Sequence, residues 1–213
     1  MGSIYSQRLL EHCLRREPWP SDLLDRAIEE DEGRALLSIV VERLADLFEP
    51  ELCLVYERLF REVIARVCPD LIPRLRISSE GKAPNDTKRV YVLSRITLGA
   101  DVAVTSVLID AAKRRYPDAE ILFVGPRKSY EMFEADPRIR HVAAPYARSG
   151  ALVDRLRASA SLHFDDGIVI DPDSRLTQLG LISVCDPRNY LFFPSRSYGG
   201  DGAESLQIGR AHV

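Results

Sequence analysis

The sequence has few cysteines and no long apolar run, and each shortage excludes a class of protein. Its four cysteines are scattered without a C-x-x-C pair, so reduced and mostly buried thiols are expected rather than disulfides or a zinc site. No apolar stretch approaches the roughly 20 residues that a membrane-spanning helix needs. The first 19 residues also lack the apolar segment of a signal peptide. A cytoplasmic location is therefore expected.

Lysine is scarce as well, with 4 lysines against 25 arginines. We attribute this bias to the base composition of the coding sequence rather than to phosphate recognition. The net charge of -3 gives no global electrostatic reason to expect nucleic acid as a partner. By contrast, 46% of the residues are hydrophobic, which is enough for a folded core of one large or two small domains.

The clearest local pattern lies in residues 89–125. Residues 90–93 form an apolar, β-branched and aromatic run that predicts a buried strand, and a turn containing Gly99 follows. From Asp101 onward the apolar period changes to three and four residues, which predicts a helix ending before Pro117. Its expected buried face comprises Val102, Thr105, Leu108, Ile109 and Ala112. A second apolar run at 121–124 completes a predicted βαβ unit.

Helical periodicity dominates residues 1–76. We predict a helix over residues 4–16 and another over 21–30, with Ser21 as its N-cap. A third apolar stripe runs from 37 to 48, and a fourth helix is predicted over 51–68, with Pro50 at its first position. This region could be a partner-docking or membrane-surface module, or a small helical domain that buries its own stripes. Its 11 basic and 15 acidic residues are mixed, which favours the second interpretation. Residues 77–88 lose periodicity and form the predicted linker.

Residues 89–198 form the second predicted domain, in which strand and helix signals alternate. After the βαβ unit we predict a helix over 127–133, a strand over 139–143, a helix over 151–160 and a strand over 167–170. Such alternation predicts an α/β fold with a Rossmann-like open parallel sheet. Ligands bind beyond the carboxyl ends of such strands, so candidate site residues are expected in the segments 95–101, 125–128 and 171–177.

Several segments resemble the amino-terminal half of glycosyltransferase family nine, the ADP-heptose:lipopolysaccharide heptosyltransferases. The resemblance covers roughly residues 89–177 and rests on the order and spacing of its motifs. The matching positions are Arg95, Asp101, Thr105, Arg114, Pro117, Ala119, Ile121, Asp136-Pro137, Ile139 and the run from Asp166 to Asp171. Two positions depart from the family pattern: Ala100 replaces a glycine, and Pro172-Asp173 replaces x-Gln. These departures leave the acceptor's identity open.

The resemblance implies that the chain is the acceptor-side half of a GT-B enzyme. Such an enzyme would transfer a heptose-like sugar, with inversion at the anomeric carbon, to an acceptor of the lipopolysaccharide type or to another glycan or lipid-linked sugar. Asp101 would be the general base. The same resemblance implies substrate binding by a further set of residues: Arg95, Thr97, Thr105, Arg127, Asp171 and Arg175. The donor would be a nucleotide sugar such as ADP-heptose, and the enzyme would need no cofactor or metal. The resemblance also allows the protein to contact the inner face of the membrane peripherally.

Simpler roles exist for the same residues. Asp101 could cap the helix that follows it, and Arg95 and Arg127 could form a solvated rim. His163, Asp165 and Asp166 could suggest a metal, but three ligands within four residues fit no standard site, so we interpret them as loop residues.

Two other functional classes compete with the transferase. A dinucleotide-dependent oxidoreductase is disfavoured, because the turn after the first strand has a single glycine where G-x-G-x-x-G is required. A catalytically inactive Rossmann-like binding module with a helical docking domain remains the main alternative, since fold alone does not determine function.

The final segment, 199–213, is predicted to be a tail. Residues 208–213 match the translation of a common sequencing adapter read through to a stop, which predicts a truncated coding sequence whose carboxy-terminal donor domain is missing. On this interpretation the chain alone would not catalyse turnover.

Overall fold

The computed structural model describes residues 3–76, 84, 86–144, 146 and 149–198. The predicted linker, 77–88, lies largely outside the described residues, and the tail 199–213 with its segment 208–213 lies wholly outside them. The described chain divides into two compact units. A helical unit contains residues 3–73, 149–157 and 196–198, and an α/β unit contains the described parts of 74–146 together with 158–195. The helical unit thus includes two segments from within the predicted domain 89–198.

The helical unit contains the predicted helices, with short irregular turns between them. Its helices are α1 (Ile4–Leu14), α2 (Ser21–Glu29), α3 (Glu42–Asp46) and α4 (Pro50–Val67). The turn η1 (Glu30–Gly33) and the π-helical η2 (Leu36–Val41) lie between α2 and α3, and η3 (Pro69–Arg74) follows α4. Pro50 opens α4 as predicted, because the first helical residue needs no N–H. Ser21 is not the predicted cap of α2. The extended residue Pro20 precedes the helix, and Ser21 is already helical.

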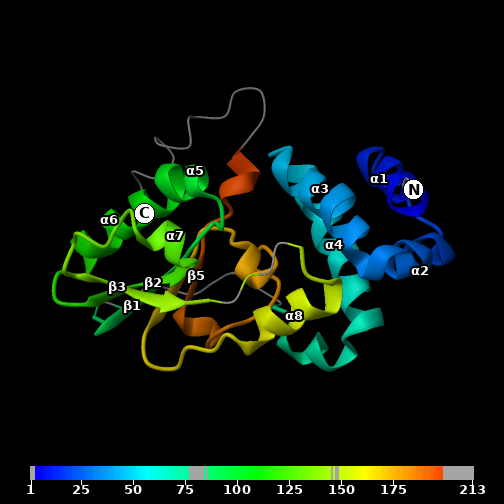
Figure 1. Cartoon of the computed structure of the whole chain (residues 1–213). Coiled ribbons are helices and arrows are strands. Elements are labelled where there is room, and N and C mark those ends of the chain that lie inside the picture. Colours follow the sequence, from blue (N-terminus) through cyan, green and yellow to red (C-terminus); the bar gives the residue numbers. More distant parts are fainter. Residues whose placement is uncertain (1–2, 77–83, 85, 145, 147–148, 199–213) are drawn as a thin grey trace. The chain divides into compact units, whose positions relative to one another are not determined.

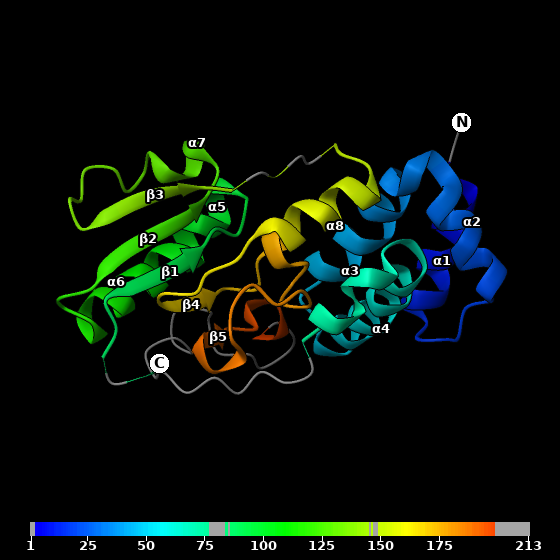
Figure 2. The same ribbon diagram turned by 90° about the horizontal axis from the view of Figure 1, so that it is seen from below.

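The α/β unit is built on five parallel strands. These are β1 (Arg89–Leu93), β2 (Glu120–Gly125), β3 (Ile139–Ala143), β4 (Ile168–Asp171) and β5 (Tyr190–Phe192), in the order β3-β2-β1-β4-β5 (Figures 1 and 2). The predicted α/β fold with a Rossmann-like parallel sheet, preceded by helices, is confirmed. Strand β5 was not predicted, since its three residues are too few to show a periodic pattern.

Both faces of the sheet are covered. The chain between β1 and β2 forms α5 (Leu98–Ala100), the π-helical η4 (Asp101–Thr105) and α6 (Ser106–Arg115), and α7 (Arg127–Tyr130) follows β2. Side chains of α6 and α7 pack with Val92 and Phe123 on one face, the side on which Figure 1 shows these helices. The other face buries Leu93 and Val124 against Leu162 and Phe164, the segment that follows α8 (Leu152–Ser161). The described residues after β4 also contain the short 3-10 turns η5 (Arg175–Thr177), η6 (Pro187–Asn189) and η7 (Ser195–Tyr198).

The π-helical turn η4 changes which side chains face the sheet. Val102 was predicted on the buried face, yet its side chain is 56% exposed. A π-helical turn holds more residues than an α-helical turn, so it rotates the residues before it relative to those after it. As a result, Asp101 and Thr105 are buried, and the predicted stripe holds only from Thr105 onward.

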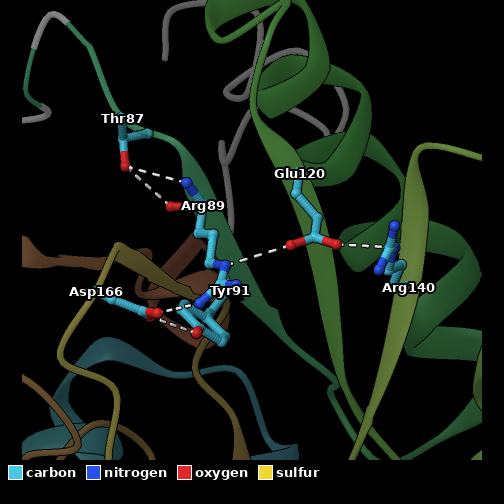
Figure 3. Close-up of polar contacts among 6 residues, drawn as sticks. All are labelled: Thr87, Arg89, Tyr91, Glu120, Arg140 and Asp166. Carbon is cyan, nitrogen blue, oxygen red and sulfur yellow. Dashed lines mark hydrogen bonds and ion pairs between the residues drawn. The ribbon is translucent and has the colours of Figure 1, made fainter.

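The amino-terminal edge of the sheet carries a ladder of ion pairs and hydrogen bonds (Figure 3). Glu120 Oε2 accepts a hydrogen bond from Arg89 Nε at 3.3 Å, and Glu120 Oε1 lies 2.8 Å from Arg140 Nε. Asp166 accepts hydrogen bonds from Arg89 and, at 2.6 Å, from the Tyr91 hydroxyl. This ladder joins the starts of β1, β2 and β3 to the residue pair before β4, and it lies at the edge opposite to the strands' carboxyl ends.

Candidate functional site

The order of the strands defines where a site is expected. The chain runs from β1 to β2 and β3 on one side, then returns to place β4 and β5 on the other side of β1. The segments that leave the carboxyl ends of β1 and β4 therefore diverge at a topological switch point, where open α/β sheets bind ligands. We call these segments the β1 loop (94–97) and the β4 loop (172–178). They contain or adjoin most of the predicted site residues.

Asp101, the predicted base, has no exposed surface. Its Oδ1 accepts hydrogen bonds from the Arg95 backbone N–H at 2.7 Å and from the Thr105 hydroxyl at 2.8 Å. Its Oδ2 accepts one from the Ser94 hydroxyl at 2.8 Å. Three donors thus hold the carboxylate, and burial without such donors would be costly for a charged group. Asp101 and Thr105 come together as predicted, although Thr105 faces the carboxylate rather than an open surface.

Asp101 does not cap the helix, which was the simpler alternative from the sequence. The helix begins three residues earlier at Leu98, and Thr97 occupies the N-cap position without a side-chain cap hydrogen bond. The Asp101 side chain instead reaches back to the β1 loop and accepts the Arg95 N–H. Its role in this structure is to hold that loop in place.

The two other predicted residues of the first loop have different environments. Arg95 is buried, and its Nη1 donates a hydrogen bond to Ser195 Oγ. The predicted solvated rim is therefore wrong for Arg95, because its guanidinium is drawn into the α/β unit. Thr97 is exposed at the start of α5, where a bound molecule could reach it.

Asp171 ends β4 and is fully buried in a hydrogen-bond network of its own. Its Oδ1 accepts the Ser174 N–H at 2.6 Å, and its Oδ2 accepts the hydroxyls of Thr177, at 2.5 Å, and Tyr190. Burial raises the pKa of the Asp171 carboxyl above its ordinary value, and these hydrogen bonds oppose the shift only in part. Burial and the neighbouring Asp171 raise the pKa of the Tyr190 phenol.

The two loops are joined directly. The Ser174 hydroxyl donates a 2.5 Å hydrogen bond to the backbone carbonyl of Ser94, and Ser174 Oγ accepts the Leu176 N–H at 3.0 Å. A second link runs through Ser195, whose hydroxyl donates to Pro172 O at 3.0 Å and whose Oγ accepts from Arg95. The carboxyl ends of β1, β4 and β5 therefore form one connected polar cluster.

The remaining predicted residues lie at different depths. Arg175 is buried and opens η5 in the β4 loop. Arg127 begins α7 after β2 and is exposed, with ion pairs to Glu131 and Glu134 of its own segment. The solvated rim predicted as an alternative for Arg127 agrees with this exposure.

Unusual backbone conformations occur in both loops. Ile96 has φ 71° and Asp173 has φ 70°. A left-handed conformation is tolerated by aspartate but is a genuine outlier for a β-branched residue such as isoleucine. Such strain persists only where the surroundings impose it, and it is common at functional sites. Here the Ile96 N–H is fixed by a 2.8 Å hydrogen bond to Ser94 Oγ.

The segment considered for a metal, His163 to Asp166, makes ordinary surface contacts. His163 Nε2 lies 2.6 Å from Asp165 Oδ1, and both side chains are well exposed. Asp166 is engaged with Arg89 and Tyr91. Within the part of the chain that the structure describes, His, Cys, Asp and Glu side chains form no group of three or more suited to a metal ion, and no helix there is long and apolar enough to cross a bilayer.

Three serines of the cluster were not among the predicted site residues: Ser94, Ser174 and Ser195, although Ser174 lies within the candidate segment 171–177. Each is completely buried and each bonds to another loop. Ser94 directly follows an apolar strand, and Ser174 follows Asp171 by three residues, a spacing at which an aspartate can accept a backbone N–H of a turn. These weak signals were present, but they gave no indication of the partner.

The chain was compared with protein-family models, with curated proteins and with solved structures, and none of them matches it.

Proposed function

We propose that this chain provides the acceptor side of a GT-B glycosyltransferase, which transfers a sugar from a nucleotide-sugar donor to a glycan or lipid-linked acceptor. The observation that carries the proposal is the connection of the β1 and β4 loops at the switch point, with Asp101 held beside Arg95. The resemblance to glycosyltransferase family nine singles out Arg95, Thr97 and Arg175 within these loops, and Asp101 and Asp171, which bond to them. A carboxylate and guanidinium groups suit an acceptor that offers a hydroxyl and carries a negative charge.

In the proposed reaction, Asp101 accepts the proton of an acceptor hydroxyl as the hydroxyl oxygen attacks the anomeric carbon of the donor sugar. The bond from that carbon to the nucleotide's phosphate oxygen breaks, and the nucleotide leaves with the electron pair. Asp101 is fully covered in this structure, so acceptor binding must move the β1 loop before the carboxylate can act. The strained Ile96 and the exposed Thr97 are the positions at which we expect that movement.

The test is an assay of sugar transfer from a panel of nucleotide sugars, including ADP-heptose, to phosphorylated and carboxylated glycan acceptors. It compares the complete product of the gene with its Asp101→Asn variant. The proposal predicts that the variant loses transfer while it still binds acceptor and unfolds cooperatively. Undiminished transfer by Asp101→Asn, or no transfer from any donor by the complete gene product, would contradict the proposal.

One observation favours a second candidate, a catalytically inactive binding module. Both oxygens of Asp101 are occupied by donors from the protein itself, as expected for a structural residue. This candidate predicts that the protein binds acceptor but transfers no sugar. Asp101→Asn would then be expected to lower its thermal stability. The transfer assay thus distinguishes the two candidates.

A further inference from the structure

Ser94 joins three strand ends, and all its polar atoms are engaged in hydrogen bonds. Its N–H donates to Val124 O of β2 at 2.8 Å, and its carbonyl accepts the Ser174 hydroxyl of the β4 loop. Its Oγ accepts the Ile96 N–H at 2.8 Å and donates to Asp101 Oδ2 at 2.8 Å. The residue has no exposed surface, so none of these bonds exchanges with water without a structural change.

The direction of the Ser94 hydroxyl is determined by this arrangement. A hydroxyl carries one proton, and here a lone pair of Oγ already receives the Ile96 N–H. The proton therefore points at Asp101 Oδ2. Since Oδ1 is held by Arg95 and Thr105, Ser94 provides the hydrogen bond that fixes the second oxygen.

The Ser94 side chain also lies close against the backbone of Gly125. Gly125 ends β2 beside it, and a Cβ on Gly125 would lie 2.4 Å from Ser94 Cβ and 3.1 Å from its Oγ. The side chain thus occupies the space that a larger residue at position 125 would fill.

We infer that Ser94 is a positioning residue for Asp101, and that its link to Ser174 makes the orientation of the Asp101 carboxylate depend on the β4 loop. The inference goes beyond the proposed function and rests on it, because it takes Asp101 as the base. Its geometric part concerns only the contacts among Ser94, Asp101 and Ser174, so it can be measured separately from turnover.

The first measurement is the amide NMR spectrum of the full chain. The Arg95 N–H reports the place of Asp101, because it bonds to Oδ1. We expect its resonance in Ser94→Ala to move in the same direction as in Asp101→Asn, and to move less in Ser174→Ala. The matched control is Ser106→Ala, which removes a hydroxyl that donates to Val102 O, one turn earlier along the chain. Because Arg95 directly follows Ser94, the direction of the shift decides: an Arg95 resonance in Ser94→Ala that stays in place or moves opposite to that in Asp101→Asn would overturn the inference.

The second measurement is steady-state kinetics of the complete gene product. Misplacement of a catalytic group by about 1 Å lowers turnover on the order of 100-fold. Ser94→Ala should therefore reduce kcat by about 10- to 100-fold and change KM little. The control Ser106→Ala should leave kcat close to that of the wild type. Unchanged kcat in Ser94→Ala, alongside lost transfer in Asp101→Asn, overturns this inference and leaves the proposed function intact. Absence of transfer by the wild type overturns the proposed function and the catalytic part of the inference together.

Discussion

Gly125 and Ser94 approach each other so closely at the ends of β2 and β1 that a methyl group on Gly125 would lie 2.4 Å from Ser94 Cβ. Gly125→Ala should therefore destabilise the protein by about 1–3 kcal/mol, the usual range for overfilling a packed interior. The matched control is Gly99→Ala, since a Cβ at Gly99 in α5 has no neighbour within 4 Å. Urea denaturation of both variants measures the difference. Equal stability of Gly125→Ala and the wild type would show that the two strand ends can separate at little cost.

Thr105 and Thr97 offer a second matched pair. The Thr105 hydroxyl is buried and donates to Asp101, whereas Thr97 is exposed and makes no side-chain cap hydrogen bond. Thr105→Val leaves Asp101 Oδ1 with one donor fewer and should lower the free energy of unfolding by about 1–3 kcal/mol. Thr97→Val should change it by less than about 0.5 kcal/mol. Thermal or urea unfolding tests this, and a larger effect at position 97 would contradict the assignment of the two hydroxyls.

Asp171 should make the protein less stable as the pH rises. Burial raises the pKa of Asp171 in the folded protein above its ordinary value of 3.8, so its contribution to stability is fully present below 3.8 and is lost as the pH rises through the folded pKa. Asp171→Asn removes this titration. In urea denaturation, we expect the free energy of unfolding of the wild type, relative to that of Asp171→Asn, to decrease as the pH rises from about 4 to the folded pKa. A difference that does not vary with pH would contradict the raised pKa.

Asp166, at the opposite edge of the sheet, should show the reverse dependence. The hydrogen bond from Tyr91 and the neighbouring Arg89 lower the pKa of this exposed carboxyl from 3.8. Its contribution is therefore present above pH 3.8 and is lost as the pH falls through the lower, folded pKa. Asp166→Asn should differ from the wild type near neutral pH and converge with it in acid. Tyr91→Phe removes the hydroxyl that bonds to Asp166, so Asp166→Asn should change the free energy of unfolding less in that background than in the wild type.

The cysteines should differ in reactivity. Cys13, Cys68 and Cys185 are buried, whereas Cys53 is half-buried. Burial raises the pKa of Cys13 and of Cys185 to about 12 and raises the pKa of Cys68 as well, which suppresses the reactive thiolate. A disulfide reagent at pH 8 should modify Cys53 in the native protein and the other three after denaturation. Mass spectrometry of labelled peptides identifies the sites, and native labelling of Cys13 would contradict this burial.

The sequence was most informative where apolar runs and helix signals are strong. Strand Ile139–Ala143 has its predicted bounds, and β1 and β2 extend the predicted runs by one residue or two. The proline at the start of α4 was also correctly placed. These features depend on local chemistry, because a buried strand and a first helical turn each select residue types from their immediate surroundings.

The details of the cluster depend on residues that are distant in the sequence. Ser94 bonds to Ser174 and Arg95 bonds to Ser195, and no periodicity links such positions. The π-helical turn that exposes Val102 and buries Asp101 is a property of the assembled helix and loop. Positions of this kind, where the local pattern fails, are where functional constraints are expected.

The position of β1 at the centre of the sheet has a consequence for synthesis on the ribosome. β1 pairs with β2, which follows soon after it, and with β4, which is made much later. Until β4 emerges, the backbone groups of residues 90–92 on one side of β1 have no strand to pair with. Such an edge readily pairs with another chain. The nascent protein is thus most prone to aggregation between completion of β2 and arrival of β4, the interval in which a chaperone would matter most.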